Sequence, residues 1–287
     1  MKKILIDFIE LSKPKLLLLV LLTTIAGFYI GSQGSADFML MGITLIGTTF
    51  VAAGALVLNQ YIERDIDSTM KRTKHRPLPD GRLEARSALI LGLTLSISGL
   101  FINFVFVNIL TGTLAVISMA AYLLVYTPMK TKSAFCIVIG AVPGALPAAG
   151  GWVAATGSFN QGALILFAIL FFWQIPHSLA IAWLYKSDYE KAGMKLLPDS
   201  YPGDNATGHQ VLMNTMALLP IGLMPSILGI TGPIHFFAAL LLGITFALFA
   251  AKFSMNQSIS TAKNLLYASY LYIPFQLGIM SFDRIPY

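Results

Sequence analysis

The sequence predicts an all-α membrane protein built as a bundle of nine transmembrane helices. Of its 287 residues, 56% are hydrophobic and only 11% are charged, and the mean hydropathy is +0.74. A soluble domain of this size carries roughly twice that fraction of charge. Nine apolar stretches approach the length of about 20 residues that a helix needs to cross a bilayer. We place them at residues 16–33, 39–59, 87–106, 109–126, 134–155, 161–183, 211–230, 233–252 and 264–282.

The connections between these stretches predict paired helices in one domain that covers residues 1–287. The connections near Asn108, Thr156 and Gly232 are very short, which is typical of helical hairpins. Two connections are long and polar, at about residues 60–86 and 184–210, and each follows an even-numbered stretch. The segment before residue 16 lacks a signal-peptide pattern. The single cysteine, Cys136, lies in an apolar stretch, so we expect a buried thiol and no intrachain disulfide.

The basic residues predict how the helices are oriented. All but one of the 19 lysines and arginines lie before the first stretch or after an even-numbered stretch, and the exception is Arg284. Positively charged loops face the cytoplasm. The N-terminus and both long loops are therefore expected on the cytoplasmic side of the plasma (inner) membrane. The net charge of +6 reflects this topology, so we expect surrounding membrane lipid and no nucleic-acid partner.

The second stretch ends with three polar side chains on one face of the helix. Asn59, Glu63 and Asp67 are four residues apart, so each step turns the helix face by only about 40°. Ionisable groups at a membrane helix are costly, which indicates a functional role. Mg²⁺ takes carboxylate and phosphate oxygens, and these three donors suit that ion. Asp65 points elsewhere if the helix continues, but an unwound helix end could bring it into the site.

A cationic run follows this helix at once, and it contains Lys71, Arg72 and Arg76. The two arginines are four residues apart and could present bidentate forks to diphosphate oxygens. Oxygen donors beside dense cations suit a diphosphate bridged by a divalent metal. The alternative is a solvated loop whose charges serve only topology. That alternative explains the cations but leaves the three polar side chains on one helix face unexplained.

The stretch from Asn59 to Gly81, NQYIERDIDSTMKRTKHRPLPDG, resembles the first aspartate-rich motif of the UbiA superfamily of intramembrane prenyltransferases. That motif runs Asn-x-x-x-Asp-x-x-x-Asp, followed by Arg-Thr and Arg-Pro-Leu. It matches Asn59, Glu63, Asp67, Arg72-Thr73 and Arg76-Pro77-Leu78. Glu63 departs from the usual aspartate, although some members of the superfamily use glutamate there. This departure concerns the coordination geometry more than the activity.

Motifs in the second half narrow the resemblance. Trp-Gln-x-Pro-His at Trp173–His177, followed by Asp-Tyr-x-x-Ala-Gly from Asp188 and by Leu-Pro, resembles the protohaem IX farnesyltransferases, or haem O synthases. The Tyr126–Lys130 segment and the Gly140–Trp152 stretch with its two prolines also resemble that subfamily. The likeness therefore covers nearly the whole chain. Quinone-precursor prenyltransferases usually carry a second Asp-x-x-x-Asp here, whereas this chain has a single aspartate.

The resemblance implies a cytoplasm-side cavity in which a farnesyl group passes from farnesyl diphosphate to a vinyl group of haem B. Water adds in the same reaction, and the product is haem O. Haem B would be a substrate rather than a cofactor, and the cofactor would be Mg²⁺. The enzyme that oxidises haem O to haem A is a further partner suggested by the pathway. The implied catalytic residues are Asn59, Glu63, Asp67, Arg72, Arg76 and Asp188.

The resemblance also implies separate roles within this set. The metal would be held by Asn59, Glu63, Asp67 and Asp188, and it would neutralise the leaving diphosphate. The two arginines and Lys130 would stabilise the charge that develops on the diphosphate. The remaining substrate contacts would come from Asp65, Lys71, Tyr126, Lys130, Gln174, His177 and His209.

Gln174 and His177 are three residues apart, which predicts a shared helix face beside a backbone carbonyl that Pro176 leaves free. Histidine is the commonest axial ligand of haem iron, so His177 is a candidate ligand. A hydrogen-bonded core histidine is the alternative. His209 is a second candidate for the iron or for a haem propionate, whereas we assign no role to His235.

Two other functions remain as alternatives. The acceptor could be an aromatic or quinone precursor, but Gln174, His177 and the missing second aspartate argue against it. A transporter with a polar gate would carry charges near the membrane midplane and polar loops on both faces. The nearly uncharged outer loops argue against a transporter.

Overall fold

The computed structural model describes residues 2–32, 34–198 and 204–285, which are almost entirely helical. Within these residues, nine segments are long and apolar enough to cross a membrane, which confirms the predicted fold class. The chain is a multi-pass integral membrane protein. The segments are Pro14–Gly31 (α2), Phe38–Asp67 (α3), Ala85–Val107 (α4 with η1), Ile109–Met129 (α5, η2 and α6), Cys136–Thr156 (α7), Gln161–Leu184 (α8), Ala206–Ile227 (α10), Pro233–Met255 (α11) and Ile259–Phe282 (α12).

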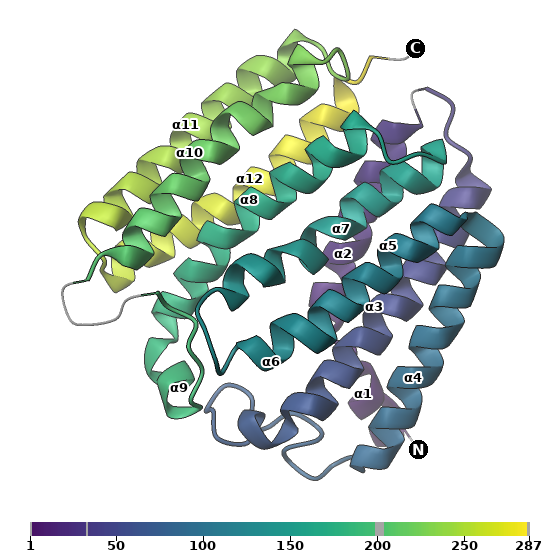
Figure 1. Cartoon of the computed structure of the whole chain (residues 1–287), viewed down its shortest axis with the longest axis vertical. Coiled ribbons are helices and arrows are strands. Elements are labelled where there is room, and N and C mark those ends of the chain that lie inside the picture. The colour runs from purple at the N-terminus through teal and green to yellow at the C-terminus, as the bar shows by residue number, and fades with distance from the viewer. Residues whose placement is uncertain (1, 33, 199–203, 286–287) are drawn as a thin grey trace.

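Two short helices lie in segments that the sequence predicted as polar lead-in and loop. They are α1 (Lys2–Leu11) and α9 (Lys186–Lys191). Figure 1 shows both at the same end of the bundle as the loop after α3, with the C-terminal end of α12 at the other end. Neither helix is long and apolar enough to span a membrane, so apolar length could not reveal it. Together they build up the polar end of the molecule.

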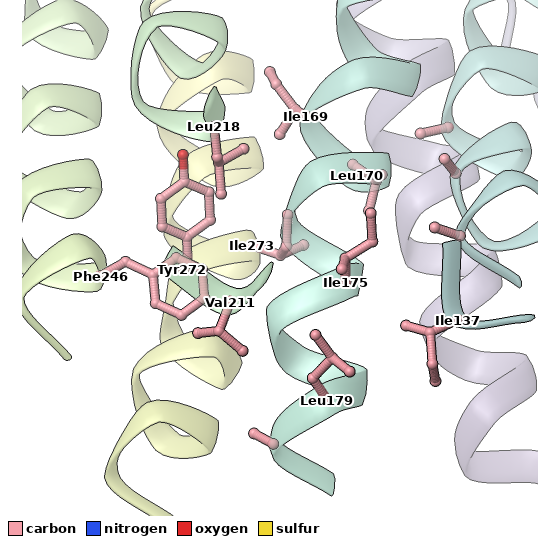
Figure 2. Packing of buried hydrophobic residues seen from close by; sticks show 14 of the residues in the cluster. Ile137, Ile169, Leu170, Ile175, Leu179, Val211, Leu218, Phe246, Tyr272 and Ile273 are labelled. Atoms are coloured by element: carbon pink, nitrogen blue, oxygen red, sulfur yellow. The ribbon is translucent and has the colours of Figure 1, made fainter. Parts of the chain in front are cut away.

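The second half of the chain packs as a solid bundle of α8, α10, α11 and α12. Figure 2 shows Ile175 and Leu179 on α8, Val211 on α10 and Phe246 of α11 against Tyr272 of α12. All five side chains are buried. The cavity described below lies on the side of α8 that faces the first half of the chain.

The helices α2 and α7 approach each other through glycines. A Cβ on Gly27 would lie 1.9 Å from the carbonyl oxygen of Ala148, and a Cβ on Gly151 would lie 2.1 Å from that of Thr24. Membrane helices come this close only where small residues meet, because larger side chains separate the backbones. This contact holds α2, and the residues before it, close to α7, and both helices line the interior cavity.

Two π-helical segments interrupt the helices on the other wall. They are η1 (Asn103–Val107), which ends α4, and η2 (Ala121–Tyr126), which follows α5 (Ile109–Ala120) and precedes α6 (Thr127–Met129). The wider π turn rotates the side chains that follow it relative to a regular α-helix, and such turns are frequent at functional sites. Here they bring Asn103, Tyr122 and Tyr126 to one interior cavity.

Candidate functional site

The cavity has a volume of about 430 Å³ and lies between α2, α3, α5, α7 and one face of α8. Most of its length is apolar, with walls formed by residues such as Val20, Val51, Leu114 and Pro147. One end is ionic and lies where α3 leaves the membrane region. An apolar channel that ends in a charged pocket can bind an amphipathic molecule with an anionic head and a hydrocarbon tail.

Three consecutive turns of α3 supply the acceptors at the ionic end, and each acceptor has its own cation. Glu63 accepts from the Lys130 ammonium at 2.8 and 3.1 Å, and both side chains line the cavity. Asp67 accepts from Arg76 at 2.6 Å. The amide oxygen of Asn59 lies 3.2 Å from the third cation. All three acceptor residues are at most 4% exposed.

The helix stays regular as far as Asp67 because the loop that follows supplies partners for its end. The hydroxyl of Thr73 donates to the Asp67 carbonyl at 2.8 Å, which satisfies an acceptor that the helix end leaves free. Arg82 then ties the loop to α1 through Asp7 and through Glu10, the latter at 2.9 Å. The predicted alternative of an unwound helix end is therefore not observed.

Lys13 is the third cation, and the sequence reasoning treated it only as a topology charge. It donates to Asn59 from the start of α2 and lines the cavity. Its backbone is left-handed, with φ of 49°, which is a strained conformation for a non-glycine residue. Burial, together with the positive charges of Arg76 and Lys130, lowers the pKa of Lys13 to about 7, against the opposing effect of the carboxylates. The feature of the sequence that could have singled out Lys13 is its position directly before Pro14, where the first membrane-spanning helix begins.

Aromatic rings surround the next cation, Lys130. Its ammonium lies 4.6 Å from the centre of the Tyr126 ring, which stacks on Tyr122 at 5.7 Å. Burial alone would lower the pKa of Lys130, but the influence of Tyr126 and the Glu63 carboxylate outweighs it and raises the pKa. The ammonium group therefore stays charged. Tyr126 was predicted as a substrate contact, whereas Tyr122 was missed and is placed here by the π turn.

Arg72, in the first polar loop, contacts the second polar loop at the ionic end. It donates to the Tyr189 hydroxyl at 3.0 Å and lies 5.4 Å from the ring centre of Tyr185. Tyr189 also lines the cavity; it stands in the Asp-Tyr-x-x-Ala-Gly motif but was not among the predicted site residues. Asp188 precedes it on α9 but lies outside the set of described residues that line the cavity. Asp188, the predicted metal ligand, is therefore not part of the described cavity wall, whereas the next residue, Tyr189, is.

Several other predicted contacts also lie away from the cavity. The side chain of Asp65 is 87% exposed and meets Arg64 at 3.7 Å. Lys71 and His209 are exposed, and neither is among the described residues of the cavity wall. The cause is helix rotation for Asp65, since α3 continues past it. His209 begins α10, and no α10 residue is among the described residues of that wall.

Gln174 and His177 are separated by the structure. Gln174 lines the cavity and packs against Gly144, where an added Cβ would meet its amide oxygen at 2.1 Å. His177 instead places Nδ1 2.8 Å from the hydroxyl of Ser269 on α12 and stacks on Trp173 at 4.8 Å. It lies outside the described cavity wall, because its ring is held between Trp173 of its own helix and Ser269 and Tyr270 of α12.

The acceptor set fits a divalent metal that arrives with a diphosphate. Among the described residues, no group of three His, Cys, Asp or Glu side chains converges on one point. Mg²⁺ is usually held by one or two carboxylates together with substrate phosphates. Glu63 and Asp67 line the same end of the cavity, and the Asn59 amide adjoins it. This donor set suits that mode of binding.

Comparison with known proteins gives a consistent family. The family model described as the UbiA prenyltransferase family matches residues 20–272. The chain is 39% identical to a protein named protoheme IX farnesyltransferase from Solibacter usitatus, over 97% of this chain and 98% of that protein. It is 36% identical to a protein of the same name from Aquifex aeolicus, over 97% and 95% of the two chains.

Solved structures share the fold at lower identity. A structure described as digeranylgeranylglyceryl phosphate synthase in membranes matches with a TM-score of 0.82 and 21% identity, over 99% of both chains. A UbiA homologue from Archaeoglobus fulgidus, bound to GPP and Mg²⁺, matches with a TM-score of 0.69 and 18% identity, over 96% of this chain and 99% of that one. The family match, the relatives and the shared fold agree: the chain belongs to the UbiA prenyltransferase family.

Proposed function

We propose that this protein transfers a farnesyl group from farnesyl diphosphate to a vinyl group of haem B, with addition of water, to give haem O. The observation that carries the proposal is the ionic end of the apolar cavity, where three cations and three oxygen acceptors meet. That pocket suits a diphosphate head, and the apolar channel suits its hydrocarbon tail. The acceptor is inferred from the relatives named protoheme IX farnesyltransferase.

The chain's own residues would bind and orient the donor. Asn59, Glu63 and Asp67 would hold the metal that accompanies the diphosphate, and the cations that these side chains now hold would then be available to the diphosphate. The cations are Lys13, Arg76 and Lys130, and Arg72 stands beside them. A bound Mg²⁺ supplies neutralisation of the negative charge on the leaving group. Asp188 would reach the metal only if α9 moved toward the cavity.

The cations also explain how the carbon–oxygen bond would break. Positive groups held in a water-poor pocket stabilise the charge that grows on the departing diphosphate oxygen. The apolar wall keeps water from the allylic cation that remains on the farnesyl group. The vinyl carbon of the porphyrin then attacks that cation, and water captures the cation left on the porphyrin side.

The haem contacts are proposed to come from two sides of α8. Gln174 reaches the cavity, and His177 has its Nδ1 held by Ser269. A histidine fixed in this way presents its other nitrogen, Nε2, to a metal. We propose His177 as the contact to haem iron. The ionic end is proposed to face the cytoplasm, because the basic residues gather there.

The test is mass spectrometry of the porphyrin after purified protein is incubated with haem B, farnesyl diphosphate and Mg²⁺. The expected product carries one farnesyl group and one water, and EDTA abolishes its formation. Unmodified haem with a folded sample would contradict the proposed acceptor. Transfer to a phenolic acceptor in a parallel incubation would then favour the quinone-precursor alternative.

A further inference from the structure

Thr127 of α6 supports Asn59 from behind the ionic end of the cavity. The side-chain nitrogen of Asn59 donates to the Thr127 hydroxyl at 3.1 Å, and that hydroxyl donates to the backbone carbonyl oxygen of Tyr122 at 2.8 Å. Asn59 and Thr127 are both at most 4% exposed. At the other end of the amide, the Asn59 oxygen accepts from the Lys13 ammonium at 3.2 Å. One chain of hydrogen bonds therefore joins η2 and α6, through α3, to the start of α2.

The π-helical segment η2 provides the carbonyl that Thr127 needs. A π turn pairs residues five apart, and both the backbone N–H and the hydroxyl of Thr127 reach the Tyr122 carbonyl oxygen. A carbonyl oxygen has two lone pairs, so it can accept both hydrogen bonds. The threonine side chain is stiff because it branches at Cβ. The hydroxyl hydrogen is therefore held toward Tyr122, and only the lone pairs of the hydroxyl remain for Asn59.

The direction of these bonds determines which end of the Asn59 amide faces the cavity. A hydroxyl group has a single hydrogen, and that of Thr127 is committed to Tyr122. The hydroxyl can therefore only accept from Asn59, so it selects the amide nitrogen and leaves the amide oxygen for the ionic end. A flipped amide would set its oxygen against an acceptor, and buried polar groups without partners are costly.

Lys13 imposes the same orientation in the absence of substrate, because an ammonium group can only donate. In the proposed function its charge turns to the diphosphate, and a metal takes its place at the Asn59 oxygen. Lys13 itself lines the cavity, so movement of this one flexible side chain uncovers that oxygen toward the ionic end. Thr127 is then the contact that keeps the oxygen, rather than the nitrogen, directed at the metal.

We propose that Thr127 is a positioning residue that holds the Asn59 amide with its oxygen toward the metal of the bound diphosphate. The inference rests on the proposed function, because it assumes a prenyl diphosphate with Mg²⁺ at the ionic end. Removal of a group that orients a metal ligand typically weakens metal affinity by about 10- to 100-fold. Thr127→Val keeps the branched shape of the side chain and removes the hydroxyl.

The test measures binding of the donor rather than transfer, so it does not depend on the acceptor. The full chain in lipid nanodiscs is mixed with a radiolabelled, non-reacting thiolo analogue of farnesyl diphosphate, and the bound analogue is counted over a series of Mg²⁺ concentrations. We expect Thr127→Val to need at least about tenfold more Mg²⁺ for half-maximal binding. Thr127→Ser keeps the hydroxyl and should restore the wild-type requirement.

Thr113→Val is the matched control for loss of a threonine hydroxyl. Thr113 is exposed on α5, and its hydroxyl likewise donates to a backbone carbonyl, that of Ile109, at 2.8 Å. Its Mg²⁺ requirement should equal that of wild type. Thermal unfolding of each variant reports separately on the fold.

A second background separates orientation of the amide from support of the fold. Asn59→Asp places an oxygen at both ends of the side-chain group, so its orientation no longer matters to a metal. In that background, Thr127→Val should leave the Mg²⁺ requirement nearly unchanged. An equal shift in both backgrounds would overturn the positioning role and make Thr127 a purely structural residue.

The remaining outcomes distinguish this inference from the proposed function. A wild-type Mg²⁺ requirement in folded Thr127→Val would overturn the positioning role alone, as would a failure of Thr127→Ser to restore it. If Thr127→Val does not fold, Thr127→Cys replaces it, because a thiol is only a weak acceptor, and an unchanged requirement there would also overturn the role. Binding of the analogue by wild type without Mg²⁺, or no binding at all, would overturn the proposed function as well.

Discussion

Asp65 and Asp67 lie only two residues apart on α3, yet the helix places the two carboxylates in opposite surroundings. Asp67 is 1% exposed, lines the cavity and holds Arg76, whereas the side chain of Asp65 is 87% exposed. Asp67→Asn keeps an oxygen for Arg76 but removes the charge. We expect at least about a 100-fold loss of turnover, the size of effect seen when one transition-state contact is removed.

The matched control for this change is Asp65→Asn on the same helix. We expect it to keep nearly normal turnover, because its carboxylate meets only Arg64 at 3.7 Å and is open to solvent. Thermal unfolding of both variants checks that the fold is kept. Near-normal turnover by Asp67→Asn would remove this residue from the proposed metal site.

Substitution of His177 can distinguish a role as ligand of haem iron from a role in helix packing. Its ring is held by Ser269 and stacked on Trp173, so His177→Ala should lower the melting temperature in either case. If it contacts haem iron, haem affinity should fall by at least about tenfold, which is 1.4 kcal/mol. Affinity for the prenyl diphosphate should stay nearly unchanged.

Titration of haem followed by absorbance makes this measurement, and the iron-ligand band should shift in the variant. His209→Ala is the comparison, since His209 is exposed at the start of α10. An unaltered haem affinity in His177→Ala would place His177 among the structural histidines. A loss in His209→Ala alone would move the haem contact to α10.

At the scale of elements, the contact between α2 and α7 determines the position of Lys13, which directly precedes α2. Gly151→Ala would push its Cβ to 2.1 Å from the Thr24 carbonyl oxygen, so the helices must separate. Overpacking of this kind typically costs 1–3 kcal/mol, hence about that loss is expected here. Because Lys13 begins α2, binding of the diphosphate should weaken as well.

Gly150→Ala is the control one residue away, where an added Cβ meets nothing within 4 Å. There we expect unchanged or slightly raised stability, because alanine favours a helix over glycine by about 1 kcal/mol. Unfolding monitored by circular dichroism in detergent compares the two variants. Equal stability of both would show that α2 can move away from α7 without loss.

At the scale of the whole molecule, the polar loops define one face of the bundle. We propose that this face is cytoplasmic, and the single native cysteine, Cys136, is buried. Cysteines introduced at two exposed positions, Lys74→Cys after α3 and Ser158→Cys between α7 and α8, can therefore report the orientation. A membrane-impermeant maleimide should label Lys74→Cys only in inverted vesicles.

The same reagent should label Ser158→Cys only from the opposite side. Wild type gives the background, because its thiol lies within the core. Labelling of Lys74→Cys in right-side-out vesicles would reverse the proposed topology. It would also place the ionic end of the cavity on the outer face of the membrane.

Much of this architecture could be predicted from local sequence features. Apolar runs reach membrane-spanning length without any tertiary information, and all nine predicted spans are present in the described residues. The spacing of Asn59, Glu63 and Asp67 predicted one shared face because helix geometry repeats locally. The motifs around these residues also indicated the family, which the comparisons confirm.

Other features depend on contacts between distant segments, and the sequence alone could not assign them. Lys13 meets Asn59 across 46 residues, and Lys130 meets Glu63 across 67. Any of the many cations on that face satisfies the same charge pattern, so only packing selects the partner. His177 likewise could face either side of α8 until the position of α12 was known.

The sequence by itself therefore determined the nine membrane-spanning segments seen in the described residues and the polar face of α3, because hydropathy and helical periodicity are local properties. The tertiary structure alone decided which cation holds each acceptor, that Lys13 belongs to the site, and that Asn103 and Thr111 line the cavity. These features of the site depend on how each helix is rotated about its axis and on how closely neighbouring helices approach each other. Both are set by π turns and by glycine contacts whose partners lie far apart in the chain.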